Sequence, residues 1–203
     1  MKNLSVSFVF LFFGTTVVAQ KIPYTNCDNC WNADSLGDHR VVLEYNGSGK
    51  IAKATILWRR KDEHPELKRI IVEDAATHQR VLNVKTGEIN RVFGNVYFET
   101  VSGKGTYYVY YMPYKNEGRS NYPKGVYLSP ENTSSPDWLG MFQEKNMSVV
   151  TVKEIQSVNS FNTFYPMEII ATPVETDRLD HDNKSKDFLI FPRRSLALYP
   201  YEK

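Results

Sequence analysis

The chain has 203 residues, of which 41% are hydrophobic and 24% are charged, with two cysteines and a formal net charge of +2. This composition is typical of an ordinary globular protein, and the near balance of charge argues against nucleic-acid binding, which depends on a concentrated basic surface. A β/α barrel enzyme typically needs about 250 residues, so the length predicts one small domain that is not a barrel.

Residues 1–19 are predicted to be a secretory signal peptide. Lys2 precedes an apolar run at residues 4–13, and the Val-Val-Ala of residues 17–19 is typical of a cleavage site. Gln20 follows where a lipid-modified leader would have a cysteine, which favours free export to the periplasm or the extracellular space. Beyond the leader no apolar stretch approaches the roughly 20 residues that a membrane-spanning helix needs, so we expect no membrane span.

Residues 20–38 are predicted to be a polar lead-in segment that contains Cys27 and Cys30. In an oxidising compartment, two thiols three positions apart can close a disulfide. A redox-catalytic pair would need to begin a helix after a strand, but these cysteines are expected in a loop before the first strand. The pair is therefore a candidate structural disulfide, with two free thiols as the alternative.

From His39 onward the sequence predicts β-strands. Apolar and polar side chains alternate over residues 39–45, and the Asn-Gly-Ser-Gly of residues 46–49 predicts the turn of a hairpin. The next run places Ala54, Ile56 and Trp58 on one face, as in a half-buried antiparallel sheet. The basic residues 59–61 that follow, with Asp62, are expected to form a solvated strand end.

Further strands recur about every dozen residues without helices between them. This spacing is typical of an antiparallel β-sandwich or jelly roll, so the predicted fold class is all-β. The Thr-Gly-Glu of residues 86–88 is expected to form a turn, and Pro113 to end the sixth strand. The predicted strands cover residues 68–73, 81–85, 96–99 and 107–112.

The second half of the chain is predicted to be more irregular. Residues 115–136 are expected to form a long loop, and Ser135 or Asp137 to cap a short helix at 138–145. Strands are predicted at 148–158, 161–171 and 187–191, and a short helix or surface loop at 174–186. The β-sandwich domain, with one or two short helices, is thus assigned to residues 39–192, and a C-terminal tail to 193–203.

Aromatic residues are the most informative side chains, because the sequence contains 13 tyrosines. Sugars can stack on exposed aromatic rings while polar groups bind their hydroxyls, so an aromatic sheet face or loop is a plausible carbohydrate platform. The alternative is that these rings pack in the core or cover an interface with another domain. The candidate carbohydrate-binding residues are Tyr108, Tyr110, Tyr122, Tyr127 and Trp138.

No catalytic, metal-binding or cofactor-binding motif is recognised. The four histidines lack a partner three or four positions away that would form a helical metal face. Glu73 and Asp74 are neighbours on a predicted strand and would point to opposite faces, so they do not form the carboxylate pair of a glycosidase. A competing hypothesis is a small hydrolase that uses Glu99 or the acids of residues 177–182.

Several segments together resemble a known family. Residues 58–62, 81–84, 103–114, 122–127, 166–168 and 187–192 are similar to the N-terminal β-sandwich of large exported Bacteroidetes proteins related to glycoside hydrolase family 123. The resemblance covers most of the chain after the leader. In that family the sandwich precedes a β/α barrel, whose adjacent acidic residues assist cleavage of N-acetylhexosamines.

The sequence departs from these relatives just after Pro192 and ends at Lys203. This departure suggests a truncated or split member without the catalytic barrel. The resemblance therefore implies a non-catalytic accessory module of a glycan-degrading system, which binds carbohydrate or packs on a catalytic-domain protein. The alternatives are a glycoside hydrolase fragment that is active only with a second chain, and a remnant without function.

Overall fold

The computed structural model describes residues 22–158, apart from Ser120, Pro123, Glu144 and Lys145. The predicted signal peptide, the elements predicted between residues 161 and 191, and the C-terminal tail lie outside the described residues.

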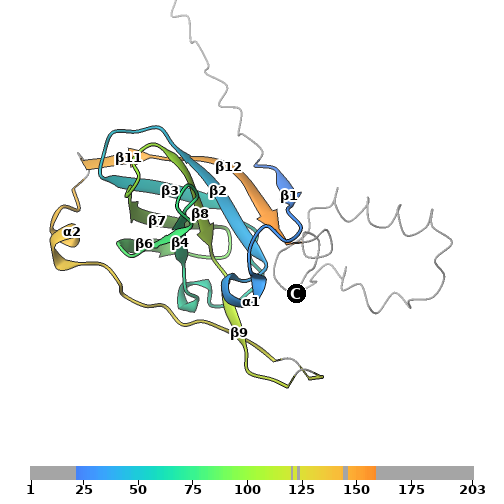
Figure 1. The fold of residues 1–203 in the computed structure, drawn as a ribbon. Coiled ribbons are helices and arrows are strands. Elements are labelled where there is room, and N and C mark those ends of the chain that lie inside the picture. Colours follow the sequence, from blue (N-terminus) through green and yellow to red (C-terminus); the bar gives the residue numbers. More distant parts are fainter. Residues whose placement is uncertain (1–21, 120, 123, 144–145, 159–203) are drawn as a thin grey trace, which may run out of the picture.

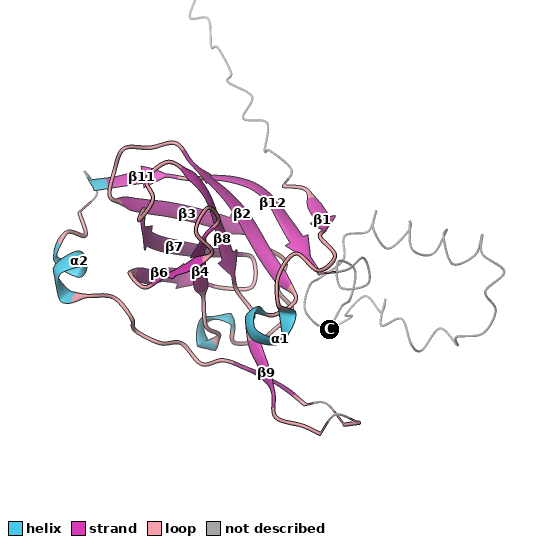
Figure 2. Cartoon of the chain, viewed as in Figure 1, coloured by secondary structure: helices cyan, strands magenta, loops and turns pink. Residues whose placement is uncertain are grey.

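Two β-sheets pack face to face and enclose the core (Figure 1). Within the described residues the chain is mainly strands, with only short helices between them, as Figure 2 shows. The predicted all-β sandwich is therefore confirmed. In spatial order the six-stranded sheet contains β1 (Tyr24–Asn26), β12 (Thr151–Ser157), β2 (His39–Tyr45), β8 (Gly105–Tyr110), β4 (Ile71–Asp74) and β5 (Gln79–Val81).

The facing sheet has four strands in the described part of the chain, and a separate hairpin extends from the sandwich. The sheet contains, in spatial order, β11 (Met147–Val149), β3 (Ile51–Leu57), β7 (Phe93–Glu99) and β6 (Val84–Ile89). The remaining elements are the hairpin strands β9 (Tyr114–Asn116) and β10 (Gly125–Tyr127), the helices α1 (Ala33–Leu36) and α2 (Pro136–Gly140), and a 3₁₀ turn at Pro65–Leu67.

The core forms where the alternating apolar residues of the two sheets meet. Val41 and Leu43 of β2 and Ala54 and Ile56 of β3 are fully buried, which confirms the alternation predicted for these strands. Phe98 of β7 packs against the ring of Tyr107 from the opposite sheet, with 5.0 Å between the ring centroids. Full burial of a large apolar side chain stabilises a fold by about 1.5–3 kcal/mol, so this inter-sheet layer holds the sandwich together.

The predicted hairpin turn at residues 46–49 is wrong. The strand before it, β2, belongs to the six-stranded sheet, whereas β3 belongs to the four-stranded sheet, so this segment crosses between the sheets. Its glycines serve close packing. A Cβ atom on Gly47 would lie 2.4 Å from the Ser148 Cβ, and one on Gly49 would lie 2.6 Å from the Asn146 carbonyl oxygen. Glycine here permits approach of the chain to the segment that leads into β11.

The predicted turn at residues 86–88 is also wrong, because these residues lie inside β6. The pairing of β6 with β7 shifts register between Thr86 and Ile89, as at a β-bulge. Glycine in a strand often marks such an irregularity rather than a turn.

Two segments that were expected to be irregular contain strands. The lead-in segment includes β1, which pairs in parallel with β12, so Cys27 follows a strand instead of preceding the first one. The long loop predicted at 115–136 includes most of the β9–β10 hairpin. Short strands such as these carry too few residues for alternation to reveal them.

The predicted short helix exists, but it is shifted toward the N-terminus. α2 covers Pro136–Gly140, and the Ser135 hydroxyl accepts a hydrogen bond of 3.2 Å from the backbone N–H of Trp138. Serine at the N-cap and proline in the first turn fix its start. Ser135 is thus the cap, rather than Asp137.

Candidate functional site

The strand register brings aromatic and charged residues together on the outer face of the six-stranded sheet. Arg40 of β2 pairs with Tyr110 of β8, and Val42 pairs with Tyr108, which in turn pairs with Glu73 of β4. The intervening strand residues face the core, so these side chains point to the other side. We call this surface the Arg40 face; it consists of Trp31, Arg40, Glu73, Tyr108, Tyr110 and Gln156.

Arg40 lies at the centre of this face and is only 5% exposed. Its guanidinium carbon lies 3.8 Å from the ring centroid of Tyr108 and 4.5 Å from that of Trp31, so the cation contacts two aromatic rings. Its Nε donates a hydrogen bond of 2.8 Å to the Gln156 side chain, and its Nη1 donates one of 3.4 Å to the Tyr110 hydroxyl. Cation–π contacts contribute about 0.5–2 kcal/mol each. Together with the hydrogen bonds, these contacts hold the guanidinium and both rings in place.

The other two rings of the face are Tyr110, which is buried, and Trp31, which is partly exposed. Their ring centroids are 6.0 Å apart in an edge-on arrangement, and the Trp31 Nε1 donates a hydrogen bond of 2.7 Å to the Gly37 carbonyl. Burial raises the pKa of the Tyr110 hydroxyl, although the hydrogen bond from Arg40 opposes this shift. Tyr110 therefore stays protonated at neutral pH.

Cys27 and Cys30 are joined by a disulfide, with their Cα atoms 5.5 Å apart. This small ring directly precedes Trp31 in the chain. The N–H of Cys27 donates to the Ser157 carbonyl at the end of β12. The cross-link thus begins at this strand contact and restricts the backbone that leads to Trp31, whose ring lies against Arg40.

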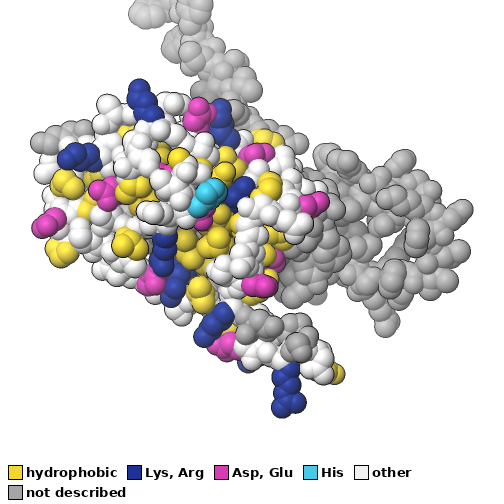
Figure 3. Space-filling model, in the orientation of Figure 1, with side chains coloured by type: hydrophobic (Ala, Val, Ile, Leu, Met, Phe, Trp, Pro, Cys, Tyr) yellow, Lys and Arg dark blue, Asp and Glu magenta, His cyan; other side chains and the backbone are white. Residues whose placement is uncertain are grey.

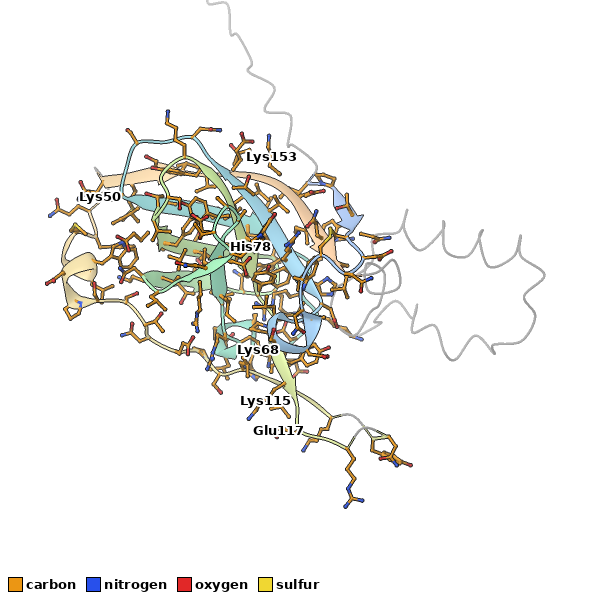
Figure 4. All side chains as sticks on the ribbon, viewed as in Figure 1. Lys50, Lys68, His78, Lys115, Glu117 and Lys153 are labelled. Carbon is orange, nitrogen blue, oxygen red and sulfur yellow. A yellow bond between two sulfur atoms is a disulfide. The ribbon has the colours of Figure 1, made fainter. Side chains whose placement is uncertain are left out.

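Tyr108, like Trp31, is a partly exposed ring of the Arg40 face, and polar groups surround it. The Glu73 carboxylate lies 3.1 Å from the Nδ1 of His78, an exposed residue that Figure 4 labels. Figure 3 shows a hydrophobic area beside the histidine in view, bordered by basic and acidic side chains. An aromatic centre with a polar rim suits a ligand that combines apolar ring faces with hydroxyl groups.

The structure places the five predicted carbohydrate-binding rings in three different regions. Tyr108 and Tyr110 lie together, but Tyr110 is 1% exposed and offers no free ring face. Tyr122, which is 79% exposed, and Tyr127 lie on the β9–β10 hairpin. Trp138 is 1% exposed and packs from α2 against Phe142, so its ring is also inaccessible to a ligand in this structure.

Sequence reasoning missed Trp31 and Arg40, the two residues that complete the site. Arg40 occupies a strand position where a charged residue is ordinarily solvated, and only the pairing of β2 with β8 reveals the rings beside it. Trp31 follows Cys30 in a segment without periodicity. Its proximity to the cysteine pair was the one available signal.

The candidate acids do not form a catalytic pair in the described residues. Asp74 is buried and its Oδ1 accepts hydrogen bonds from the backbone N–H groups of Ala76 and Thr77, whereas Glu73 lies on the outer face. Glu99 accepts a hydrogen bond of 2.7 Å from the Asn83 side chain. The acids at 177–182 lie outside the described residues.

A search of the described part of the chain finds no cluster of three or more histidine, cysteine or acidic side chains that would hold a metal ion. Over the same residues, no helix has the length and apolar character needed to cross a membrane.

Comparison with known proteins gives one match. The model of the family described as "Glycoside hydrolase 123, N-terminal domain" matches residues 29–158, a range that includes every residue of the Arg40 face and both sheets except β1. No curated protein and no solved structure matches the chain.

Proposed function

Because the chain belongs to the family of glycoside hydrolase 123 N-terminal domains, we propose that it is a non-catalytic accessory module of a glycan-degrading system. In this proposal the module is exported and binds carbohydrate on the Arg40 face. The supporting observation is the partly exposed ring of Tyr108, which Arg40 supports at 3.8 Å. A ring held in place in this way loses little conformational freedom when a sugar stacks on it.

The polar rim supports the same function. Glu73 and Gln156 lie on the same face as Tyr108 and supply hydrogen-bond acceptors and donors. Glu154, on the same strand as Gln156, accepts hydrogen bonds of 2.8 Å from both Thr25 and Gln156, which fixes its carboxylate. Fixed polar groups around a ring face are what recognition of sugar hydroxyls requires.

The carbohydrate proposal is tested by retention of the purified chain on a broad panel of immobilised neutral glycans. We expect Tyr108→Ala to weaken binding by about tenfold, because an aromatic contact contributes roughly 0.5–1.5 kcal/mol beyond buried area. The matched control is Tyr97→Ala, which removes a partly exposed tyrosine from β7 in the opposite sheet. Absence of retention on every glycan, or equal losses for both variants, contradicts the proposal.

The non-catalytic assignment has a separate test. Glu73 and Asp74, adjacent on β4, point to opposite faces of the sheet and do not form the carboxylate pair that glycoside cleavage requires. We therefore expect the purified chain to leave chromogenic N-acetylhexosaminides intact over extended incubation. Turnover that survives repeated purification would contradict this assignment and favour the hydrolase alternative.

A second candidate function, packing on a catalytic partner, is favoured by the strand end that begins with Arg59 and Arg60. Arg60 was expected at a solvated strand end, but its side chain is fully buried and its Nε and Nη2 donate hydrogen bonds of 2.9 and 2.8 Å to the Asp62 carboxylate. Its Nη1 is buried and has no hydrogen-bond partner in the described part of the chain. A partner cannot reach this buried atom, but Leu57 and Val92 beside it are 54% and 67% exposed, and a docking partner can cover these apolar side chains.

Copurification with a separately encoded glycoside hydrolase catalytic domain tests this second candidate. We expect Val92→Glu to weaken the complex, because a charged side chain would replace an exposed apolar one at the interface and its burial is costly. Glycan retention by the same variant serves as the check that the domain is folded. Failure of the wild-type chain to bind such a domain would exclude this function without affecting the carbohydrate proposal.

A further inference from the structure

The β9–β10 hairpin extends away from the sandwich, as Figure 1 shows. At its base, the rings of Tyr114 and Tyr127 meet edge-on, with their centroids 6.4 Å apart, and the Lys68 Nζ lies 5.1 Å from the Tyr127 ring centroid. Further out, the N–H of Glu117 donates to the Lys124 carbonyl, and Arg119 and Tyr122 form a bridge. The antiparallel pairing thus continues beyond the base.

The register of this hairpin places its charged residues on one face. Lys115 pairs with Val126 across the hairpin. On the first strand, Glu117 and Arg119 follow Lys115 at every second position. On the returning strand, Tyr122 and Lys124 precede Val126 with the same spacing. Alternate residues of a strand share a face. The Lys115–Glu117 ion pair at 2.7 Å agrees with this arrangement. We call this surface the basic face; it consists of Lys115, Glu117, Arg119, Tyr122, Lys124 and Val126.

The basic face has three cations and one anion, an excess of two positive charges in a chain whose total is +2. Glu117 neutralises part of this charge through Lys115, and Lys115 and Lys124 hold the pKa of Glu117 below its usual value. Arg119, Lys124 and Tyr122 are all exposed. Figure 3 shows basic side chains at both the base and the tip of this projection.

We propose that the basic face of the β9–β10 hairpin is a binding site for acidic polysaccharide. Arg119 and Lys124 contact carboxylate or sulfate groups of the polymer, and Tyr122 stacks on one of its sugar rings. The planar guanidinium of arginine matches the geometry of such oxyanions. This site is distinct from the Arg40 face, and it does not depend on the function proposed for that surface.

The shape and composition of the hairpin favour a polysaccharide over an acidic protein. A stable protein interface buries about 800 Å² on each partner around an apolar centre. The basic face is only one hairpin wide, and Tyr122 and Val126 are its only uncharged side chains. A narrow, charged strip with one aromatic ring instead suits a linear anionic chain.

The test measures affinity of the full chain for polygalacturonate, chondroitin sulfate and neutral dextran. We expect binding to both acidic polymers at low salt, and much weaker binding at about 0.5 M salt, where surface charges are screened. The double variant Arg119→Glu/Lys124→Glu should bind at least about tenfold more weakly, because each lost ion pair contributes up to about fivefold and each reversed charge repels the polymer. Tyr122→Ala should weaken binding while leaving the salt dependence unchanged.

The matched control is Lys50→Glu/Lys104→Glu, which changes the net charge equally at exposed positions outside the hairpin. Figure 4 shows Lys50 at the opposite end of the molecule from Lys115 and Glu117. Equal losses in the two double variants, or no binding of the wild-type chain to either acidic polymer, would overturn the proposal. The proposal would also be overturned if Arg119→Glu/Lys124→Glu kept its affinity for both acidic polymers and lost only the binding of an acidic protein. Tyr108→Ala should leave acidic-polymer binding intact, so failure here is distinguishable from failure of the Arg40 face.

Discussion

At Gly94 of β7, the sandwich leaves no room for a side chain. A Cβ atom there would lie 2.1 Å from the Cη2 of Trp58 and 2.9 Å from the Cδ1 of Ile89. The indole cannot retreat freely, because its Nε1 donates a hydrogen bond of 2.7 Å to the Asn90 carbonyl. This position shows how tightly the aromatic layer is packed at the scale of a single residue.

We therefore expect Gly94→Ala to lower the free energy of unfolding by about 1–3 kcal/mol, the usual cost of overpacking. Urea denaturation monitored by circular dichroism measures the change. Gly140→Ala is the control, because an added Cβ at Gly140 meets no heavy atom within 4 Å. Similar midpoints for Gly94→Ala and the wild-type chain would show that Trp58 can move.

Asp74 links stability to pH. Burial raises the pKa of its carboxyl, but hydrogen bonds from Ser102, Thr77 and Ala76 lower it more, and the net pKa lies below the usual 3.8. A lowered pKa contributes stability that is complete above the unfolded value and is lost as the pH falls through the folded value. Asp74→Asn should therefore be less stable than wild type at neutral pH, and the difference should narrow below about pH 4. Urea unfolding at a series of pH values measures this, and a constant difference would contradict it.

At the scale of elements, the sequence predicted those strands whose alternation is long enough to be distinctive. Residues 39–45 and 51–57 became β2 and β3 with the expected faces buried. The assignment of these strands to different sheets was not predicted. Glycines such as those at 47 and 49 are as typical of a hairpin turn as of a segment that passes close to another part of the backbone. The Arg40 face was missed for a related reason, since cross-strand pairing is not encoded in local periodicity.

The Cys27–Cys30 ring and Trp31 act as one element over the Arg40 face. A loop this short is expected to add only about 2 kcal/mol by restricting the unfolded chain. Reduction should therefore loosen Trp31 without unfolding the sandwich. We expect increased acrylamide quenching of tryptophan fluorescence after reduction, with the thermal midpoint lowered by only about 4–8 °C. Trp31→Phe should abolish the increase, and its persistence in that variant would contradict the prediction.

At the scale of the whole molecule, the two sheets depend on the shared core between them. Phe98 and Tyr97 are neighbours on β7 and face opposite sides, with Phe98 fully buried and Tyr97 partly exposed. We expect Phe98→Ala to destabilise the domain by about 3–5 kcal/mol, and Tyr97→Ala by much less, because Tyr97 loses mainly its contact with Phe142. Thermal unfolding distinguishes the two variants, and comparable losses would contradict the dominant contribution of the layer between the sheets.

The parallel pairing of β1 with β12 also affects the order in which the domain can be built during synthesis. β12 lies between β1 and β2, so the hydrogen bond from Thr25 to Glu154 joins residues 129 positions apart. Contacts between residues that lie far apart in the sequence slow folding. Until the ribosome has released the whole of β12, which ends at Ser157, the edge of β2 that β12 will cover stays open and can pair with other chains. A chaperone that covered the edge of β2 until β12 had emerged would prevent such pairing.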